Sequence, residues 1–314
     1  MRWKTECGGN LACNSVSQKS APTASLAQPC FSAMSRGEPL PPRCDAKTKK
    51  RKFVATFVAP QKPPRLPIDL SKLVLDVGEH QVPKDVAAMF VPHNAIFAFD
   101  VETHDMVPKA KRLEDLRSDA SFSNEFFNRL RVVQIGWAVG KANDDVPVVF
   151  EHLVRPNGFE ITPEAALKHG ICNRYAEENG RPIADVILDF FEAATVAHRQ
   201  GALFTSFNFD FDAGMIRSEL KRANLDEEAE QWDKFIANKA DTMDKKIGKW
   251  VMSFTTGGDK GFLNLDETAK ALVPEKELAL CKERHQAGAD ARLHWFLCRN
   301  LSQRAARTEN RFNT

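Results

Sequence analysis

Short apolar runs alternate with amphipathic segments from residue 94 onward. Four of the apolar runs have the length and composition of buried strands. The predicted strands cover residues 95–101, 131–139, 146–154 and 202–207. Pro147 has no N–H to donate to a sheet ladder, so we place it at the start of its strand.

Helical periodicity separates the later strands and dominates the last third of the chain. It is clearest over residues 183–198, where apolar side chains recur on one face. Shorter helices are predicted over 163–169 and 213–223, and the segment from residue 227 onward is mainly helical. Strands that alternate with helices in this way predict an α/β domain.

The composition divides the chain into four parts. Residues 1–52 are rich in Ser, Thr, Ala, Pro and Gly and poor in acids, so we expect a mostly disordered basic tail. Residues 53–93 combine prolines with short apolar stretches and are expected to drape over the domain as an N-terminal extension. The α/β domain occupies residues 94–303, and residues 304–314 form a C-terminal tail.

A compact basic cluster ends the N-terminal tail. It is typical of a nuclear import signal or of an arm that binds phosphates, although a solvated charge run has the same composition. The few acids and scattered Arg, Lys and Ser before it leave an organellar transit peptide open. The cluster consists of Lys47, Lys49, Lys50, Arg51 and Lys52.

Charge and cysteine content limit the class of protein. Residues 1–94 carry 14 Lys and Arg against 7 Asp and Glu, and the remainder carries 30 against 35. Bound divalent cations would neutralise part of the acidic domain, so a polynucleotide partner stays compatible with it. The odd number of cysteines, 7, favours a reducing, intracellular compartment. Apolar runs stay well short of about 18 residues, so no membrane partner is expected.

Two carboxylates end the first predicted strand. Asp100 and Glu102 are two positions apart, so both project from the same face of the strand. Hard oxygen ligands in this position suit Mg²⁺ or Mn²⁺. Alone the pattern is weak, because many strands end in acids that meet solvent.

A third carboxylate follows the strand at 202–207. Asp212 opens the next predicted helix, and Asp210 competes with it for a place beside the first two acids. The N-x-x-F-D spacing favours Asp212 as the ligand and Asp210 as a solvated neighbour. An acid at a helix start also stabilises the helix dipole without any other role.

The string H-x-A-x-x-D-A near the C-terminus contains His285 and Asp290. On one regular helix their side chains would lie about 140° apart, at roughly 100° per residue, and would not serve one site. We therefore predict that His285 lies in the turn before a helix and Asp290 on its first turn, an arrangement that Gly288 permits. The neighbouring His294, one turn after Asp290, could extend the site, but we interpret it as a helix residue that packs near Trp295.

In their order, the strings FAFDVET, NFDFDAG and H-x-A-x-x-D-A resemble the motifs of the DEDD exonucleases. The histidine of the last motif assigns the resemblance to the DnaQ-like, or DEDDh, branch. The resemblance covers residues 94 to about 301 and includes VVQIGWA at 132–138 and the segment 153–171. It implies a ribonuclease H-like fold, with a mixed central sheet flanked by helices.

The resemblance also implies a role for each matched residue. Asp100, Glu102, Asp212 and Asp290 would hold two Mg²⁺ or Mn²⁺ ions, and His285 would be the general base for the attacking water. The implied activity is a metal-dependent 3′-to-5′ exonuclease that hydrolyses single-stranded DNA or RNA ends to nucleoside 5′-monophosphates. Positions that lie near the terminal nucleotide in the family match Thr103, His169 and Asn208.

The chain departs from the family in two places. Phe207 stands where many relatives carry a histidine. This difference affects packing or substrate contact more than metal binding. The connection over 104–130 is unusually long and predicts a short helix or flap near the site. Two alternatives stay open: a specialised exoribonuclease for RNA trimming, deadenylation or oligoribonucleotide scavenging, and a nucleic-acid-binding module without turnover. All five matched catalytic positions are present, which favours an enzyme.

Overall fold

The computed structural model describes residues 81–90, 93–106, 125–255 and 263–312. The predicted tail with its basic cluster and most of the predicted extension lie outside these residues. So does the middle of the connection over 104–130. Among the helices that the structure does describe, none is long and apolar enough to cross a membrane.

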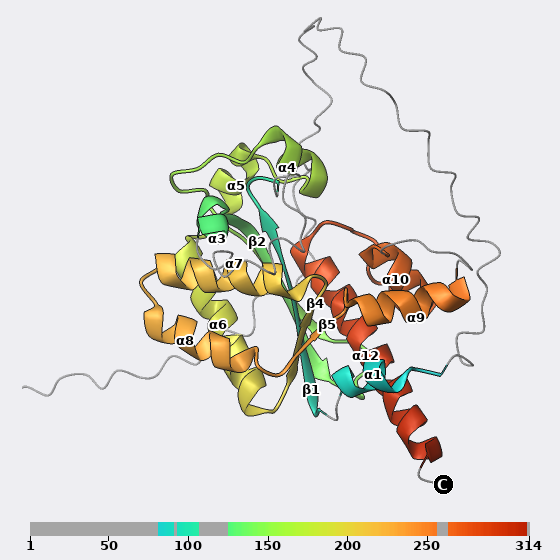
Figure 1. The fold of residues 1–314 in the computed structure, drawn as a ribbon. Helices are drawn as coiled ribbons and strands as arrows, with labels where there is room; N and C mark the ends of the chain where they lie inside the picture. The colour runs from blue at the N-terminus through green and yellow to red at the C-terminus, as the bar shows by residue number, and fades with distance from the viewer. Residues whose placement is uncertain (1–80, 91–92, 107–124, 256–262, 313–314) are drawn as a thin grey trace, which may run out of the picture. The chain divides into compact units, whose positions relative to one another are not determined.

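A five-stranded mixed sheet forms the centre of the described domain (Figure 1). In the order β3-β2-β1-β4-β5, the first three strands are antiparallel, β4 is parallel to β1, and β5 is parallel to β4. The strands are β1 (Ala95–Thr103), β2 (Val132–Lys141), β3 (Val148–Leu153), β4 (Leu203–Ser206) and β5 (Lys239–Asp241). Four of them match predicted strands to within a few residues.

Helices cover both faces of the sheet (Figure 1). One face carries α6 (Ile183–Arg199), α7 (Phe209–Arg222) and α8 (Asp226–Phe235). The other carries α1 (Lys84–Ala87), α9 (Lys245–Thr255), α10 (Leu265–Leu272) and α12 (Ala287–Phe312). The shorter helices are η2 (Ala88–Phe90), α3 (Glu125–Arg129), α4 (Pro163–His169), α5 (Asn173–Asn179) and α11 (Glu275–Leu278). This is the ribonuclease H-like fold, a mixed central sheet flanked by helices, that the sequence predicts.

The alternation of side chains along β1 decides which face each functional residue meets. Phe97 and Phe99 pack with α6, α7 and α8, whereas Ile96 and Ala98 pack in the cluster that contains α12. Asp100 continues the second series, since side chains two apart on a strand share a face. The acids at the end of β1 are therefore directed toward the side of the sheet that α12 covers.

Close backbone contact brings the start of α12 onto β2. A Cβ atom at Gly136 would lie 2.1 Å from the carbonyl carbon of Ala287 and 2.2 Å from the nitrogen of Gly288. Any side chain larger than hydrogen at position 136 would push the helix away. Small residues on both sides, Gly136 on β2 and Ala287 and Gly288 at the first turn of α12, therefore allow this close approach.

Two element boundaries differ from the predictions. Helix α7 begins at Phe209 instead of 213, because Asn208 adopts a left-handed φ of 72° that starts the helix and buries Phe209. Helix α12 continues through the predicted C-terminal tail to Phe312. Ala305 is buried in the core beyond residue 303, so this part of the helix packs on the domain.

The described end of the predicted N-terminal extension contributes to the core. Val82, Val86 and Phe90 are buried in the same apolar cluster as the inner face of α12. Asp85 lies 3.9 Å from the ammonium group of Lys246 on α9. Residues 82–90 are thus packed against α9 and α12, and burial of their apolar side chains stabilises that arrangement.

Candidate active site

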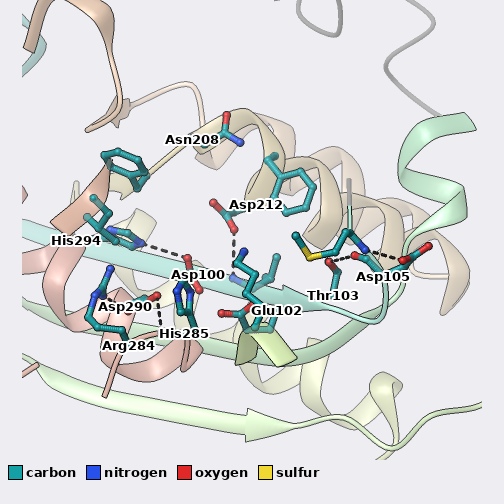
Figure 2. Close-up of a pocket in the computed structure, with 16 residues that line it drawn as sticks. Asp100, Glu102, Thr103, Asp105, Asn208, Asp212, Arg284, His285, Asp290 and His294 are labelled. Carbon is teal, nitrogen blue, oxygen red and sulfur yellow. Dashed lines mark hydrogen bonds and ion pairs between the residues drawn. The ribbon is translucent and has the colours of Figure 1, made fainter. Parts of the chain in front are cut away.

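A cavity of about 370 Å³ lies among the end of β1, the start of α7 and the start of α12 (Figure 2). Segments that are far apart in the sequence meet there. Its lining includes all five residues predicted to be catalytic: Asp100, Glu102, Asp212, His285 and Asp290. Of the three residues predicted to bind substrate, Thr103 and Asn208 line the cavity.

Burial shifts the protonation of the four carboxyl groups. It raises the pKa of Asp100 to about 7 and that of Asp290 to about 7, with the charge of Asp100 adding to the second shift. Burial, with the neighbouring Asp100, raises the pKa of Glu102 to about 8, and burial also raises the pKa of Asp212. Acids this close together take up protons or bind cations, because their charges repel in a poorly solvated site.

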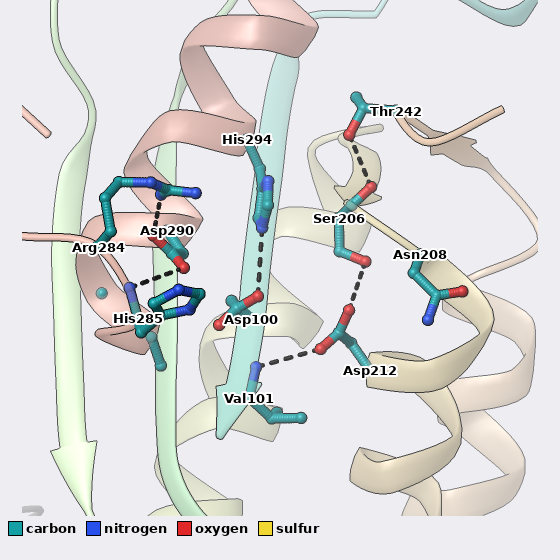
Figure 3. Close-up of polar contacts among 12 residues, drawn as sticks. Asp100, Val101, Ser206, Asn208, Asp212, Thr242, Arg284, His285, Asp290 and His294 are labelled. Carbon is teal, nitrogen blue, oxygen red and sulfur yellow. Dashed lines mark hydrogen bonds and ion pairs between the residues drawn. The ribbon is translucent and has the colours of Figure 1, made fainter. Parts of the chain in front are cut away.

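The carboxylate of Asp212 is held by two hydrogen bonds (Figure 3). Its Oδ1 accepts from the backbone N–H of Val101 at 3.2 Å, and its Oδ2 accepts from the hydroxyl of Ser206 at 2.9 Å. The backbone carbonyl of Ser206 in turn accepts from the hydroxyl of Thr242 at 2.9 Å. Asp212 is therefore fixed to β1 and β4, which places a third acid beside the first two.

Asp210 lies in a different environment. Its Oδ1 is 2.7 Å from the ammonium group of Lys239, and nearly half of its side chain is exposed. Asp212, by contrast, is only 3% exposed. Of these two acids, only Asp212 lines the cavity.

His285 lies off the helix that carries Asp290, as the spacing requires. Helix α12 begins at Ala287, and His285 has a left-handed φ of 59°. The backbone N–H of His285 donates to Oδ2 of Asp290 at 3.2 Å and closes the turn. The exposed His285 ring and the buried Asp290 carboxylate then line the same cavity.

Side chains from β2 and β3 anchor the start of α12. The N–H of Ala287 donates to the side-chain oxygen of Gln134 at 3.0 Å, and the N–H of Gly288 donates to Glu151 at 2.9 Å. These N–H groups have no partner within their own helix, since they belong to its first turn. The contacts fix the helix end that carries Asp290.

The donor set fits a divalent metal ion. Glu102, His285 and Asp290 each offer a ligand atom, and these atoms lie within 4.8 Å of one another. Asp100 and Asp212 add carboxylate oxygens to the same cavity. A set dominated by carboxylate oxygens is suited to Mg²⁺ or Mn²⁺.

Two cationic side chains lie beside the acids. The guanidinium of Arg284 pairs with Asp290 (Figure 2) and, at 2.6 Å, with Asp266. Lys168, which is exposed at the end of α4, also lines the cavity. Burial, followed by the charges of Lys168 and Arg284, lowers the pKa of His285 below its usual value near 6.5. His285 is therefore neutral near pH 7.

His294 occupies the place that the sequence analysis offered as the alternative to packing near Trp295. It lines the cavity, and its Nε2 lies 3.3 Å from Oδ1 of Asp100. Its ring is fully buried and is stacked against Phe207, with 6.4 Å between ring centroids and an interplanar angle of 8°. The i to i+4 spacing from Asp290 is the only signal in the sequence that indicates this position.

His169 lies behind the cavity wall. Its Nδ1 accepts from the backbone N–H of Ile171 at 3.1 Å, so its Nε2 carries the proton and donates to the carbonyl oxygen of Thr103 at 3.2 Å. Burial lowers its pKa to about 4, which keeps the ring neutral. The side chain of His169 thus supports the strand end that carries Thr103.

The described end of the 104–130 connection forms the short helix α3. Phe127 from this helix is buried, and its ring would overlap a Cβ atom at Gly214 of α7. At the other end, Nδ1 of His104 accepts from the backbone N–H of Arg131 at 3.0 Å. The two ends of the connection are therefore tied to the domain near β1 and α7.

Solved structures of Exonuclease I share this fold. The zinc-bound form of the E. coli ExoI–ssDNA complex matches with a TM-score of 0.51 and 15% identity, over 71% of this chain and 43% of that chain. The complex of E. coli Exonuclease I with a dT13 oligonucleotide matches with a TM-score of 0.51 and 16% identity, over 71% and 44%. An apo form of Exonuclease I matches with a TM-score of 0.50 and 15% identity, over 71% and 45%.

The matched region spans less than half the length of those proteins. No protein-family model and no curated protein matches the sequence. At these identities the structural similarity shows the fold. The ribonuclease H-like fold is therefore established, and the activity is argued from the cavity.

Proposed function

We propose that the protein is a metal-dependent nuclease that removes nucleoside 5′-monophosphates from the 3′ end of single-stranded nucleic acid. The observation that carries the proposal is the meeting of four carboxylates and one histidine, from three distant segments, in one cavity. The fold shared with Exonuclease I, which was solved with single-stranded DNA and with dT13, supports single-stranded DNA as the substrate.

The acids would hold the metal ions. Asp100, Glu102, Asp212 and Asp290 offer enough oxygen atoms for two Mg²⁺ or Mn²⁺ ions, and burial raises the pKa values of all four despite the nearby charges of Lys168 and Arg284. When bound, such ions lower the pKa of water and stabilise the negative charge that develops on phosphate oxygens. The buried contacts of Asp212 to Val101 and Ser206 would keep the acid cluster in place.

His285 would act as the general base. Its ring is exposed at the cavity, and its lowered pKa leaves it neutral and able to accept a proton near pH 7. The turn at φ 59° and the hydrogen bond from its own N–H to Asp290 fix the backbone from which the ring extends. The base is therefore held next to the acids without itself lying on α12.

Other cavity residues would contact the substrate. Thr103 and Asn208 line the cavity beside the acids, and His169 would act on substrate through its hydrogen bond to the carbonyl of Thr103. Lys168 and Arg284 are suited to phosphate oxygens, since both are cations on the cavity lining. Phosphate contacts of this kind orient a strand without reading its sequence.

The test is a degradation assay with two aspartate variants. Purified protein is incubated with 5′-labelled single-stranded DNA, and with RNA of equal sequence, in Mg²⁺, Mn²⁺ or EDTA. We expect a ladder of products shortened from the 3′ end, no products in EDTA, and no degradation when the 3′ end is blocked. Asp212→Asn should abolish the ladder, whereas Asp210→Asn, a change two residues away outside the cavity, should keep it.

Three results would contradict the proposal. A ladder in EDTA would exclude the metal mechanism, and cleavage of blocked ends would indicate an endonuclease or attack from the 5′ end. A ladder that Asp212→Asn leaves intact would exclude the acid cluster. Degradation of RNA in strong preference to DNA would instead identify an exoribonuclease.

A further inference from the structure

His294 is a buried polar residue for which the proposed reaction has no role. It lies on α12 one turn after Asp290, and its side chain is fully buried. Its neighbours Trp295, Phe296 and Leu297 are also fully buried. An imidazole in such surroundings loses hydration that only specific hydrogen bonds can replace.

The imidazole makes one hydrogen bond among the described residues. Its Nε2 lies 3.3 Å from Oδ1 of Asp100, and its Nδ1 is buried without a hydrogen-bond partner in the described part of the chain. When Asp100 is ionised, as a metal ligand is, it only accepts hydrogen bonds, so the proton of a neutral imidazole is then on Nε2. The single contact that offsets the burial of the ring is therefore directed at a predicted metal ligand.

Packing leaves the ring little freedom to turn away. Phe207 stacks on it at an interplanar angle of 8°, and the backbone of α12 fixes its base. Asp290 and His294 are four residues apart and share one face of α12, so the helix presents both toward the end of β1. Figure 3 shows His294 above Asp100, with Asp290 on the preceding turn.

We propose that His294 is a positioning residue that fixes the carboxylate of Asp100 through its Nε2–H group and leaves the second oxygen of Asp100 for a divalent cation. This inference rests on the proposed function, because it assigns Asp100 to a metal ion. Hydrogen bonds from outside the coordination sphere orient metal ligands, and their loss typically lowers metal affinity by about 10-fold to 100-fold.

The direct test measures binding of Mn²⁺ alone by titration calorimetry. His294→Phe keeps a buried aromatic ring and removes the donor, so it should weaken Mn²⁺ binding by about tenfold or more. His294→Gln can donate from its amide and should restore most of the affinity. The matched control is His198→Phe, since His198 stacks on Phe235 of α8 at 4.4 Å and is remote from the cavity lining.

A second measurement needs no variant. Long-range ¹H–¹⁵N spectra of the wild-type protein, recorded with saturating diamagnetic Mg²⁺ so that Asp100 is ionised, distinguish the two tautomers of each histidine, and His294 should carry its proton on Nε2. A proton on Nδ1 would overturn the inference even if His294→Phe failed to fold. Unchanged Mn²⁺ affinity in folded His294→Phe would overturn it alone, whereas a wild-type protein that binds no Mn²⁺ would overturn the proposed function as well.

Discussion

Oδ1 of Asp212 accepts a hydrogen bond from the backbone N–H of Val101, the residue between Asp100 and Glu102, at 3.2 Å. One contact thus joins α7 to β1 across 111 positions of sequence. Because Oδ2 is bound to Ser206, both oxygens of Asp212 have a protein donor. The acid is held in a crowded cluster by neutral donors, which do not compensate its charge.

Asp212→Asn should make the metal-free protein more stable while it abolishes the activity. Asparagine keeps an oxygen for the Val101 N–H and removes one of the mutually repelling buried charges, so the melting temperature in EDTA should rise. A gain of about 1 kcal/mol corresponds to roughly 2–4 °C for a domain of this size. Differential scanning fluorimetry in EDTA, together with the degradation assay, measures both effects.

The control for this variant is Asp210→Asn. It removes an exposed ion pair to Lys239, and such pairs contribute about 0–1 kcal/mol. Its melting temperature should change little and its activity should be retained. A fall in the melting temperature of Asp212→Asn would show that its hydrogen bonds outweigh the charge repulsion.

His285→Asn should distinguish a general base from a metal ligand. Asparagine tolerates the left-handed φ of 59°, so the turn before α12 should persist. If His285 is the base, kcat should fall by about 10²-fold to 10⁴-fold while Mn²⁺ affinity changes by less than about threefold. A loss of Mn²⁺ affinity of about tenfold or more would instead make His285 a ligand, which its closeness to Glu102 and Asp290 permits.

The stability of the metal-free protein should fall as pH rises from 6.5 to 8. The folded-state pKa values of Asp100, Glu102 and Asp290 are raised to about 7 or 8, whereas the unfolded chain releases these protons near pH 4. The folded state therefore binds more protons in this window, and the free energy of unfolding decreases, by about 1–3 kcal/mol. Urea denaturation in EDTA at several pH values measures the slope.

The pH range from 6.5 to 8 is chosen because the buried histidines contribute little to the change in the free energy of unfolding there. The pKa values of His169 and His294 are lowered to about 4, so their contribution to stability is lost only as pH falls below about 6.5. Mg²⁺ should reverse the slope, because the cation binds the deprotonated acids. A free energy of unfolding that stays constant from pH 6.5 to 8 in EDTA would contradict the raised pKa values.

Local sequence rules predicted much of this site. Alternation along a strand placed Asp100 and Glu102 on one face, and the geometry of a helix placed His285 in the turn before α12. Both rules depend only on residues near in sequence. The strands at 95–103, 132–141 and 148–153 were predictable for the same reason, because each has an apolar pattern of its own.

Features that depend on distant partners were not predictable. Strand β5 has three residues, too few for a pattern, and exists through its pairing with β4. His294 has the same spacing as a core residue of α12, and only the fold reveals Asp100 beside it. Arg284 looks like an exposed cation in the sequence, whereas the fold pairs it with Asp266 and Asp290.

Gly136→Ala tests whether the fit of α12 on β2 positions the site. The new methyl group would lie 2.1–2.3 Å from backbone atoms of Ala287 and Gly288, and the backbone cannot rotate away as a side chain can. The start of α12 must shift, and it carries Asp290. We expect a loss of about 1–3 kcal/mol in the free energy of unfolding. Activity should fall by about 10²-fold, since a displacement near 1 Å can cost that much.

The matched control is Gly248→Ala in α9, where, apart from the adjoining residues and the backbone of α9 itself, no atom of the described residues lies within 4 Å of the added methyl group. Alanine in a helix interior is favoured over glycine by roughly 0.5–1 kcal/mol, so this variant should be slightly more stable and fully active. Urea denaturation and the degradation assay compare the two variants. If Gly136→Ala lost stability but kept wild-type kcat and Mn²⁺ affinity, the contact between α12 and β2 would support the fold without positioning His285 and Asp290. If the close backbone contact positions the site, Gly136→Ala should lose both stability and activity, and Gly248→Ala should lose neither.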